Sequence, residues 1–439
     1  MTTTITLRDR ILSTVPGIDP KGPRGARRAT PAISVLAAWL CLGSCTAPQP
    51  QAPDHVLPPE WEAHEAVWFS YGYLATDTVL DKLLLDLDPA TLAVCVVDGD
   101  SLAAVLKARL DSLGIAPHRY RIEPVVDSLE APVVRDVGPL FLRRADGGLA
   151  VLDAAWNYYG DTANLINASA AQRALADSLP SLFARRLGLP VVQSPLVIEG
   201  GACEINGRSD LLQVEAVTLH RNAGWSRDSI EHELKRVLGA QRVIWLQHGP
   251  ADDLWAFEPR VHGDVFNQGT GGHVDEFCRF VNDSTVLLCW PDAEEQDSVA
   301  ALTRRRMVIN ERILKKAGLH VVRVPTPVAE HHPHRVDSTR RYDRLVLLAR
   351  YPDLHHGDTI RYIHAASYLN FLLTNGRVYV PAYWHEGLPA AMRAKDERMQ
   401  AILRTHFPDR RVVPIDPRPI NQYGGGVHCW TQQQPRVKR

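Results

Sequence analysis

Short apolar runs alternate along the chain with longer segments in which apolar and charged positions recur at helical spacing. One arrangement repeats from Leu92 onward: an amphipathic helix, a glycine or Pro-Asp breaker, and a short apolar strand that ends near a proline. Its five copies occupy residues 106–124, 182–195, 233–247, 312–327 and 402–417. A recurring supersecondary unit predicts an α/β fold built from repeated modules.

Two candidate hairpins lie between these copies. Residues 278–290 contain an Asn-Asp turn between two apolar runs, and residues 368–381 contain an Asn-Gly turn in the same position. The predicted module is therefore strand, strand, helix, strand. This mixture of hairpins and helices favours a closed ring of α/β modules over a doubly wound sheet, although composition alone does not separate the two.

The first fifty-five residues differ from the rest in composition. Positive charge at residues 24–28 precedes an apolar run at 32–45, which is shorter than the roughly 20 residues of a membrane span. The run ends in a Leu-Gly-Ser-Cys tetrapeptide that finishes at Cys45 and is similar to a bacterial lipobox. The alternatives are a buried N-terminal helix and a misassigned start codon.

We therefore predict that residues 1–55 are a lipoprotein-type signal peptide followed by a Pro-rich tether, with the lipid on Cys45. The protein would then be exported and anchored in the bacterial cell envelope, facing the periplasm or the surface. Residues 56–439 are predicted to form a single α/β domain that carries the chemistry.

The composition indicates which binding partners and which cross-links between cysteines are to be expected. The 439 residues are 45% hydrophobic, and 49 basic residues against 50 acidic ones give a net charge of −1. With a net charge this close to zero, the protein has no overall positive electrostatic potential that would attract nucleic acid. We expect contact with a membrane only through the N-terminal lipid. Seven cysteines without a C-x-x-C pair indicate neither a disulfide scaffold nor a structural zinc site. Cys278 and Cys289 lie on the two arms of one predicted hairpin, so a disulfide between them is possible. Nothing in the sequence requires this disulfide.

One candidate for chemistry is a glycine-rich segment near the C-terminus, residues 423–433. Its three glycines allow the backbone to approach a ligand closely and expose the thiol of Cys429, as a nucleophile requires. Gly425 and Gly426 are then expected to line the substrate. The alternative is a buried structural cysteine that follows a glycine-rich turn.

A second candidate is the pair His273 and Asp275, at the head of a predicted strand. Residues two apart on a strand face the same side, so both side chains can enter one site. Histidine exchanges protons near neutral pH, and an aspartate beside it can bind a cation. The alternatives are half of a two-His-one-carboxylate iron site and a structural histidine.

Two further acids, Asp136 and Glu199, are each predicted at a strand end beside a glycine. The alternatives are an ion pair of Asp136 with Arg135 or a turn cap, and a solvated loop position for Glu199. Trp156 belongs to an aromatic segment, residues 153–160, that is expected to pack and to wall a pocket.

Seven motifs, taken in chain order, resemble those of agmatine deiminase and the related bacterial peptidylarginine deiminases. They are PPEWEAHEAVW at 58–68, RDVGP at 135–139, WNYYG at 156–160, EGG at 199–201, GHVDEFCRFV at 272–281, ASYLNF at 366–371 and GGGVHCWTQQ at 424–433. The similarity extends over residues 57–434, and its closing motif is the most specific. The resemblance implies the family's fold, a five-bladed α/β propeller of the pentein type.

Position by position, the resemblance also implies roles. It assigns the nucleophile to Cys429, the acid/base to His273, the partner of that histidine to Glu199, and the guanidinium anchors to Asp136 and Asp275. A guanidinium is planar, stays protonated and presents its donors in a fork, so carboxylates can bind it bidentately. Its positive charge also favours the thiolate of a nearby cysteine. The family's chemistry needs no metal and no organic cofactor.

The implied activity is cysteine-dependent hydrolysis of a guanidinium to a ureido group with release of ammonia. Agmatine is placed first, with N-carbamoylputrescine as product, a step of putrescine synthesis. Deimination of an arginine side chain to citrulline is the close alternative, because exported relatives act on protein arginines. Alternatives of other classes are a non-haem iron enzyme built on His273 and Asp275 and a non-catalytic propeller scaffold. The oligomeric state is not indicated.

The chain departs from the family's pattern in segments that would shape the far end of the pocket. The sequence GGGVHC is one residue shorter than the family's GGGNIHC, and VPAYWHEG at 380–387 replaces its usual Y-G-D-P. These differences leave the guanidinium chemistry intact. The open question is therefore the far end of the substrate.

Overall fold

A computed structural model of the chain describes residues 54–72, 74–125, 133–160, 170–254, 258–267, 269–295 and 297–438. The predicted signal peptide, its Cys45 and most of the tether lie outside the described residues. Residues 52–439 belong to one compact unit. Within the described ranges, we find no helix long and apolar enough to cross a membrane.

Four of the sheets follow one plan: two antiparallel strands, a helical crossover, and a third strand parallel to the second. Their strands in chain order are β5 (Leu140–Arg144), β6 (Leu149–Ala155) and β7 (Val191–Val197); β8 (Glu204–Ile205), β9 (Asp210–Val214) and β10 (Arg242–Leu246); β13 (Cys278–Phe280), β14 (Thr285–Cys289) and β15 (His320–Val324); β18 (Leu372–Thr374), β19 (Arg377–Pro381) and β20 (Arg411–Ile415). The crossovers run through α4 (Ala170–Leu187), α5 (Glu215–Arg221) with α6 (Arg227–Leu238), α7 (Ser298–Lys316) and α9 (Ala390–His406). The short β1 (His55–Val56) extends the first of these sheets by pairing with β5.

A fifth sheet joins the two ends of the described chain. In it, β21 (Thr431–Pro435) pairs antiparallel with β2 (His64–Ser70), and β3 (Leu92–Asp98) and β4 (Tyr120–Val125) follow in parallel. The crossovers are α1 (Leu74–Asp86) and α2 (Gly99–Ser112), with the short η1 (Pro117–Arg119) before β4. The pairing of β21 with β2 brings the C-terminal segment, including Cys429, against the N-terminal strands.

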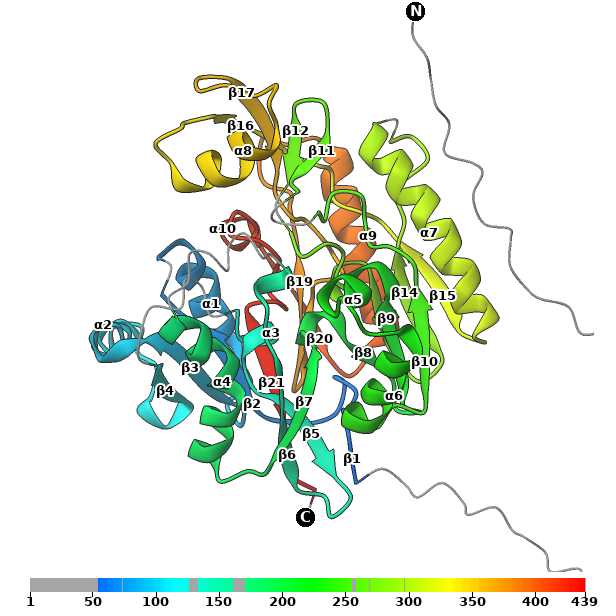
Figure 1. The fold of residues 1–439 in the computed structure, drawn as a ribbon. Helices are drawn as coiled ribbons and strands as arrows, with labels where there is room; N and C mark the ends of the chain where they lie inside the picture. The colour runs from blue at the N-terminus through cyan, green and yellow to red at the C-terminus, as the bar shows by residue number, and fades with distance from the viewer. Residues whose placement is uncertain are drawn as a thin grey trace, which may run out of the picture. The chain divides into compact units, whose positions relative to one another are not determined.

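The five repeats expected from the sequence are confirmed. They correspond to α2–β4, α4–β7, α6–β10, α7–β15 and α9–β20. Four of the helices end beside a glycine in the left-handed region, with φ between 65° and 85°, at Gly114, Gly188, Gly239 and Gly318. Figure 1 shows α2 and α7 at opposite margins of the molecule.

Both predicted hairpins are also confirmed. The Asn282 side chain accepts hydrogen bonds from the backbone N–H groups of Ser284 and Thr285, both at 2.9 Å, and so shapes the turn between β13 and β14. Cys278 and Cys289 are both free. Because Cys278 lies opposite Leu288, Cys289 is one residue past the facing position, and its side chain projects to the other face of the sheet.

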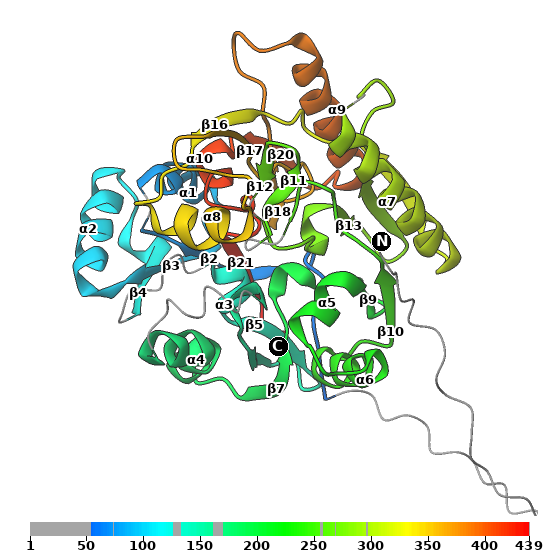
Figure 2. The same ribbon diagram turned by 45° about the horizontal axis from the view of Figure 1, so that its top comes forward.

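A sixth sheet was not predicted. It consists of β11 (Arg260–His262), β12 (Val265–Asn267), β17 (Thr359–Ile363) and β16 (His331–Arg335), with η6 (Asp343–Leu347) and α8 (Leu348–Arg350) beside it. Figures 1 and 2 show these elements grouped together away from β5 and β6. Its strands are three to five residues long, and one is rich in histidine, so the apolar pattern did not reveal them.

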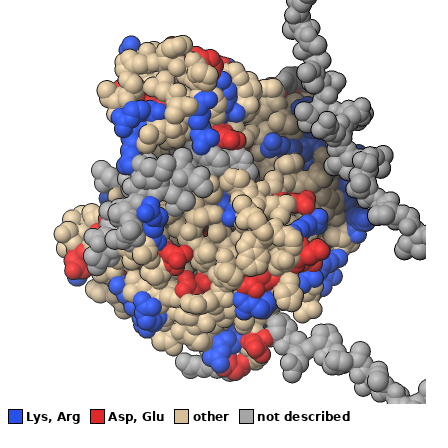
Figure 3. Space-filling model, viewed as in Figure 1, with Lys and Arg blue, Asp and Glu red and all other residues tan. Residues whose placement is uncertain are grey.

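The largest apolar cluster packs between three of the sheets. It contains Leu212 and Leu246, Leu287, and Phe371 and Val378, all fully or nearly fully buried. A second cluster covers β2 and β3 with α1 and α2 and includes Trp430, which is 0% exposed. On the face shown in Figure 3, Lys and Arg are interspersed with Asp and Glu. The structure therefore confirms a mixed α/β fold with several sheets sharing one core.

Candidate active site

The five residues proposed for chemistry come from four separate segments. Asp136 lies in α3 (Val134–Val137), Glu199 precedes η4 (Gly200–Ala202), His273 precedes and Asp275 lies in η5 (Val274–Glu276), and Cys429 precedes β21. All five are buried, with exposed fractions of 8%, 2%, 0%, 0% and 3% in that order. Close contacts join His273 to Glu199 and Asp136, and Cys429 to Asp275.

Two local predictions are wrong. His273 and Asp275 do not begin a strand, because Val274–Glu276 form a 3-10 turn and the strand starts only at Cys278. Asp136 does not follow a strand directly; it lies in the one-turn helix α3. The prediction for Glu199 is confirmed, since it follows β7. Both errors have the same cause: a glycine-rich loop can position a side chain by a tight turn as well as by a strand end.

His273 and Glu199 form a buried pair. The Nε2 atom of His273 lies 2.5 Å from Oε2 of Glu199, and Nε of Arg221 donates to the other carboxylate oxygen at 2.6 Å. Burial alone would lower the pKa of His273, but the charge of Asp136 and the bond to Glu199 raise it to about 9. Burial would raise the pKa of Glu199, but Arg221 and His273 lower it to about 2. The imidazole is therefore held as a cation near neutral pH.

This pairing predicts a pH dependence. If activity needs protonated His273, kcat/KM falls as pH rises through about 9. Glu199→Gln is expected to move the alkaline limb of this profile to lower pH by about 1 unit or more. A pH profile of kcat/KM for both proteins checks this, and an unmoved limb in Glu199→Gln would exclude the pair as its origin.

The raised pKa of His273 also affects stability. The charged imidazole contributes fully to the free energy of unfolding below the ordinary histidine pKa of 6.5, and this contribution is lost as pH rises through about 9.

Asp136 is held by the backbone and by a tyrosine. Its Oδ1 accepts from the N–H of Gly201 at 2.8 Å, and its Oδ2 accepts from the hydroxyl of Tyr159 at 2.9 Å. Burial raises its pKa. Trp156 packs edge-on against Tyr159 with ring centroids 4.9 Å apart, and it lines a cavity of 20 Å³ together with Asp136. Arg135 forms an ion pair with Glu60 at 3.0 Å, so the expected alternative of an Arg135–Asp136 pair is not what the structure contains.

Asn370 connects the thiol to two carboxylates. Its Nδ2 lies 3.1 Å from Sγ of Cys429, 3.2 Å from Oδ2 of Asp275 and 2.9 Å from Oε1 of Glu276. Its Oδ1 accepts from the backbone N–H groups of His428 at 2.9 Å and Cys429 at 3.3 Å. The same amide thus fixes both the backbone and the sulfur of the candidate nucleophile.

The electrostatics of this group favour a bound cation. Burial raises the pKa of the Cys429 thiol well above its usual value, and the nearby carboxylates of Asp275 and Glu276 raise it further. Burial would also raise the pKa of Asp275, but the hydrogen bond from His428 and the charges of His428, His273 and Arg279 together lower it. A positive charge placed among these groups would stabilise the thiolate.

The glycines leave room around the sulfur. A Cβ on Gly425 would lie 2.7 Å from Sγ of Cys429, and Gly425 also has φ of 69°, which favours glycine. A Cβ on Gly426 would lie 2.6 Å from Oδ1 of Asn370. Trp430 donates its indole N–H to the carbonyl of Gly424 at 3.2 Å and anchors the start of the loop. These contacts support the expected place of Gly425 and Gly426 beside the thiol.

Three of the candidate side chains approach Gly201 closely. A Cβ there would be 2.7 Å from Nδ1 of His273, and 3.1 Å from both Oδ1 of Asp136 and Oδ2 of Asp275. Nδ1 of His273 and Oδ1 of Asp275 are buried polar atoms without a hydrogen-bond partner. Because such atoms are costly when unpaired, they indicate groups that await a ligand.

Gly201→Ala is therefore expected to lower kcat/KM by at least about 100-fold, since an added methyl group displaces groups that must be placed within less than an ångström. The φ of Gly201 is outside the left-handed region, so the backbone conformation suits alanine, but the added methyl group would lie 2.7 Å from Nδ1 of the buried His273, so the Tm should fall as well. Steady-state kinetics and a thermal melt measure both. Normal kinetics in this variant would place the substrate elsewhere.

Several residues of the site were missed by sequence analysis. Asn370 and His428 lie inside quoted motifs but were given no role, and Glu276 directly follows Asp275. Nothing in the sequence signals that Arg221, on α5, reaches Glu199. His428 bridges two acids, with Nδ1 2.8 Å from Asp275 and Nε2 2.7 Å from Glu60.

The iron alternative does not fit this geometry. Among the described residues, the group whose ligand atoms lie close enough to hold a metal is Asp275, Glu276 and Cys429. His273 is not part of that group, and its Nε2 is taken by Glu199. A two-His-one-carboxylate site needs two histidines and a carboxylate together.

Comparison with known proteins identifies the class that this fold and site define. Residues 56–435 match the family model described as Porphyromonas-type peptidyl-arginine deiminase, and the chain belongs to this family. A Streptomyces coelicolor relative with the provisional name agmatine deiminase is 31% identical over 405 residues, covering 87% of this chain and 99% of its own. The agmatine deiminase of Stutzerimonas stutzeri is 29% identical and covers 88% and 97%. The structure of Enterococcus faecalis agmatine deiminase matches with a TM-score of 0.65 at 23% identity, over 88% of this chain and 97% of that one.

Proposed function

We propose that this protein is a cysteine-dependent hydrolase that deiminates agmatine to N-carbamoylputrescine with release of ammonia. The observation that carries the proposal is a buried thiol in contact with two carboxylates, together with buried polar atoms of His273 and Asp275 that have no hydrogen-bond partner. A planar cation fits this charge pattern. Relatives named agmatine deiminase align over nearly their whole length, which supports agmatine as the first substrate.

In the first half of the reaction, Asp136 and Asp275 hold the guanidinium by its N–H groups. The bound charge lowers the pKa of the Cys429 thiol, which releases its proton to solvent as the substrate binds, and the thiolate attacks the central carbon. His273 gives its proton to one amino group as the C–N bond breaks. Ammonia leaves, and a thiouronium remains on Cys429.

In the second half, His273 is neutral and accepts a proton from water as the oxygen attacks the thiouronium carbon. The C–S bond then breaks, its electrons return to the sulfur, and the proton of the added hydroxyl leaves to solvent as the ureido C=O forms. The products are the ureido compound and the regenerated thiolate. Glu199, bonded to both His273 and Arg221, orients the imidazole and stabilises its charged form. The roles of all five residues follow from side-chain chemistry and need no bound metal.

We also infer that the four sheets with a shared plan, together with the sheet of β21, β2, β3 and β4, are the blades of a closed five-bladed α/β propeller. The support is the repeated strand order and the pairing of β21 with β2, which links the last strand of the chain to the first of these sheets. The sheet of β11, β12, β16 and β17 is then an addition to the ring.

A second candidate substrate is an arginine side chain in a protein. The matched family is described by that activity, which favours including it in the test. The purified protein should be incubated separately with agmatine, free arginine and an arginine-containing peptide, with ammonia and ureido product measured. We expect agmatine to give the highest kcat/KM. Product from the peptide alone would replace agmatine by peptidyl-arginine, and no product from any substrate would exclude deimination of all three.

The N-terminal segment supports a proposal about location. We propose export and lipid attachment at Cys45, on the sequence pattern described above. Palmitate labelling in a bacterial host should mark the wild-type protein and not Cys45→Ser. Equal labelling of the two proteins, or labelling of neither, would contradict the assignment.

A further inference from the structure

The thiol of Cys429 lies in contact with two carboxylates at once. Its Sγ is 3.5 Å from Oδ2 of Asp275 and 3.6 Å from Oε1 of Glu276. The three groups are buried, and their ligand atoms all lie within 4.8 Å of one another. The reaction proposed above uses Cys429 and Asp275 but assigns nothing to Glu276.

These separations match the edges of a tetrahedral metal site. With a Zn–S bond of about 2.3 Å and a Zn–O bond of about 2.0 Å, a tetrahedral angle places sulfur and oxygen about 3.5 Å apart. The two measured S–O distances are 3.5 and 3.6 Å. The two sulfur–oxygen edges therefore fit a tetrahedral cation, and the third edge, between the two carboxylate oxygens, is within 4.8 Å.

The hydrogen bonds within the group leave it incompletely satisfied. The Nδ2 of Asn370 has only two hydrogens, yet three acceptors lie within 3.2 Å of it. Asp275 is 0% exposed, and its Oδ1 has no hydrogen-bond partner. This oxygen is not the one that contacts the sulfur, so the carboxylate of Asp275 has capacity for a further ligand beyond the contacts of its Oδ2.

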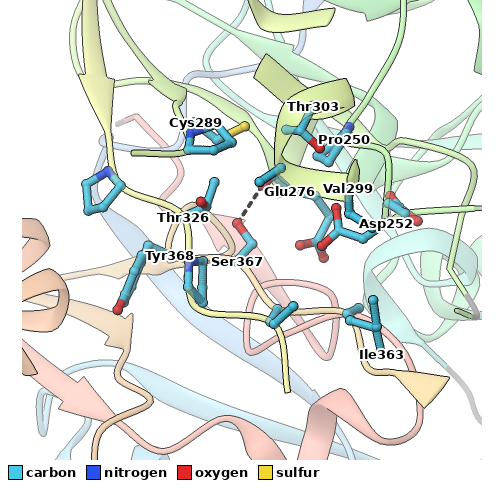
Figure 4. A pocket seen from close by; sticks show the side chains of 18 of the residues that line it. Pro250, Asp252, Glu276, Cys289, Val299, Thr303, Thr326, Ile363, Ser367 and Tyr368 are labelled. Atoms are coloured by element: carbon cyan, nitrogen blue, oxygen red, sulfur yellow. Dashed lines mark hydrogen bonds between the residues drawn. The ribbon is translucent and has the colours of Figure 1, made fainter. Parts of the chain in front are cut away.

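An acidic cavity adjoins the group on the Glu276 side. It has a volume of 60 Å³, and its lining includes Asp252, Asp253, Glu276 and Ser367. Figure 4 shows Glu276, Asp252 and Ser367 around this cavity. The cavity therefore gives a small open space next to Glu276, one of the three ligands.

We propose that Sγ of Cys429, Oδ2 of Asp275 and Oε1 of Glu276 form a binding site for a divalent cation of the zinc type, which excludes the guanidinium substrate. A thiolate with two carboxylates suits a borderline-soft metal better than magnesium or calcium. Asn370 holds the three ligands from outside, as a neighbouring hydrogen-bond donor does in metal sites. The metal is an inhibitor in this account and takes no part in the reaction. Its competition with substrate rests on the proposed function, whereas its binding does not.

The test uses the reduced full chain and Co²⁺ as a spectroscopic substitute for zinc, without substrate. Wild-type protein is expected to show a thiolate-to-cobalt charge-transfer band that Zn²⁺ removes by displacement. Cys429→Ser should lose the band, and Glu276→Gln should weaken Co²⁺ affinity by at least about tenfold, because even changes outside the ligand set cost that much. Cys289→Ala is the matched control and should keep the band, since Cys289 is buried outside the ligand group.

Two results would overturn the site: no band in the wild-type protein, or the same band in Cys429→Ser. An unchanged affinity in Glu276→Gln, with an unchanged thermal melt, would remove Glu276 from the ligand set. Deimination is measured separately in the presence of a chelator, so failure of metal binding and failure of the proposed activity are distinguishable. If both hold, Zn²⁺ should raise the KM for agmatine without lowering kcat.

Discussion

Replacing Cys429 by serine is expected to lower kcat for agmatine by at least about 10⁴-fold. Serine is close in size, and the amide of Asn370 can still donate to its oxygen, so the fold should be retained. The hydroxyl, however, remains protonated beside a bound guanidinium, whereas a thiol can ionise there. Ammonia release under saturating agmatine measures the effect, and a thermal melt confirms folding.

A matched control distinguishes loss of the nucleophile from the effect of removing any buried cysteine. Cys95 lies in β3, is 0% exposed and packs in the apolar cluster around α1 and α2. Cys95→Ala should lose about 1 kcal/mol of stability and keep its activity. If Cys429→Ser retained more than a small fraction of wild-type turnover, the thiol would not be the nucleophile.

Replacing His273 by asparagine is expected to lower kcat by about 10³- to 10⁴-fold, the usual contribution of an acid/base group. Asparagine can keep a hydrogen bond to Glu199 but cannot pass a proton to the leaving amine or take one from water. The buried Arg221–Glu199 ion pair, with its 2.6 Å contact, should stay in place and hold the loop. Single-turnover and steady-state assays with agmatine measure both halves of the reaction.

The control for this variant is His334→Asn. His334 pairs with Asp343 at 3.0 Å in the added sheet and has no place in the proposed chemistry. Its loss should leave kcat within about twofold. Wild-type activity in His273→Asn would assign proton transfer to another group.

The periodic part of the fold could be predicted from the sequence. Each helix–breaker–strand repeat has its own local signals, such as the glycine that ends α6 at Gly239, where φ is 65°. These signals act within a few residues, so no tertiary information is needed to recognise them. The sheet that contains β16 and β17 has no such local signal, because the strand His331–Arg335 has few apolar residues and is stabilised by pairing with residues far along the chain.

The site shows the same division. Cys429 and His273 stand in glycine-rich motifs that differ from their surroundings, so the sequence could indicate them. Arg221 lies on a helix between ordinary residues, and only the fold reveals that it reaches Glu199. Asn370 was visible inside a motif, but its contacts with the thiol and two carboxylates span 59 to 95 positions of sequence. Roles that depend on such distant partners cannot be predicted from local pattern.

The central claim is that Cys429 bonds covalently to the guanidinium carbon. It is tested most directly by quenching the wild-type protein with acid during turnover of agmatine and mapping the modified peptide by mass spectrometry. The account predicts a thiouronium adduct on Cys429, equal in mass to agmatine less ammonia, that disappears once substrate is consumed. Sustained turnover with no adduct on Cys429, or an adduct on another cysteine that forms and decays at the turnover rate, would contradict it.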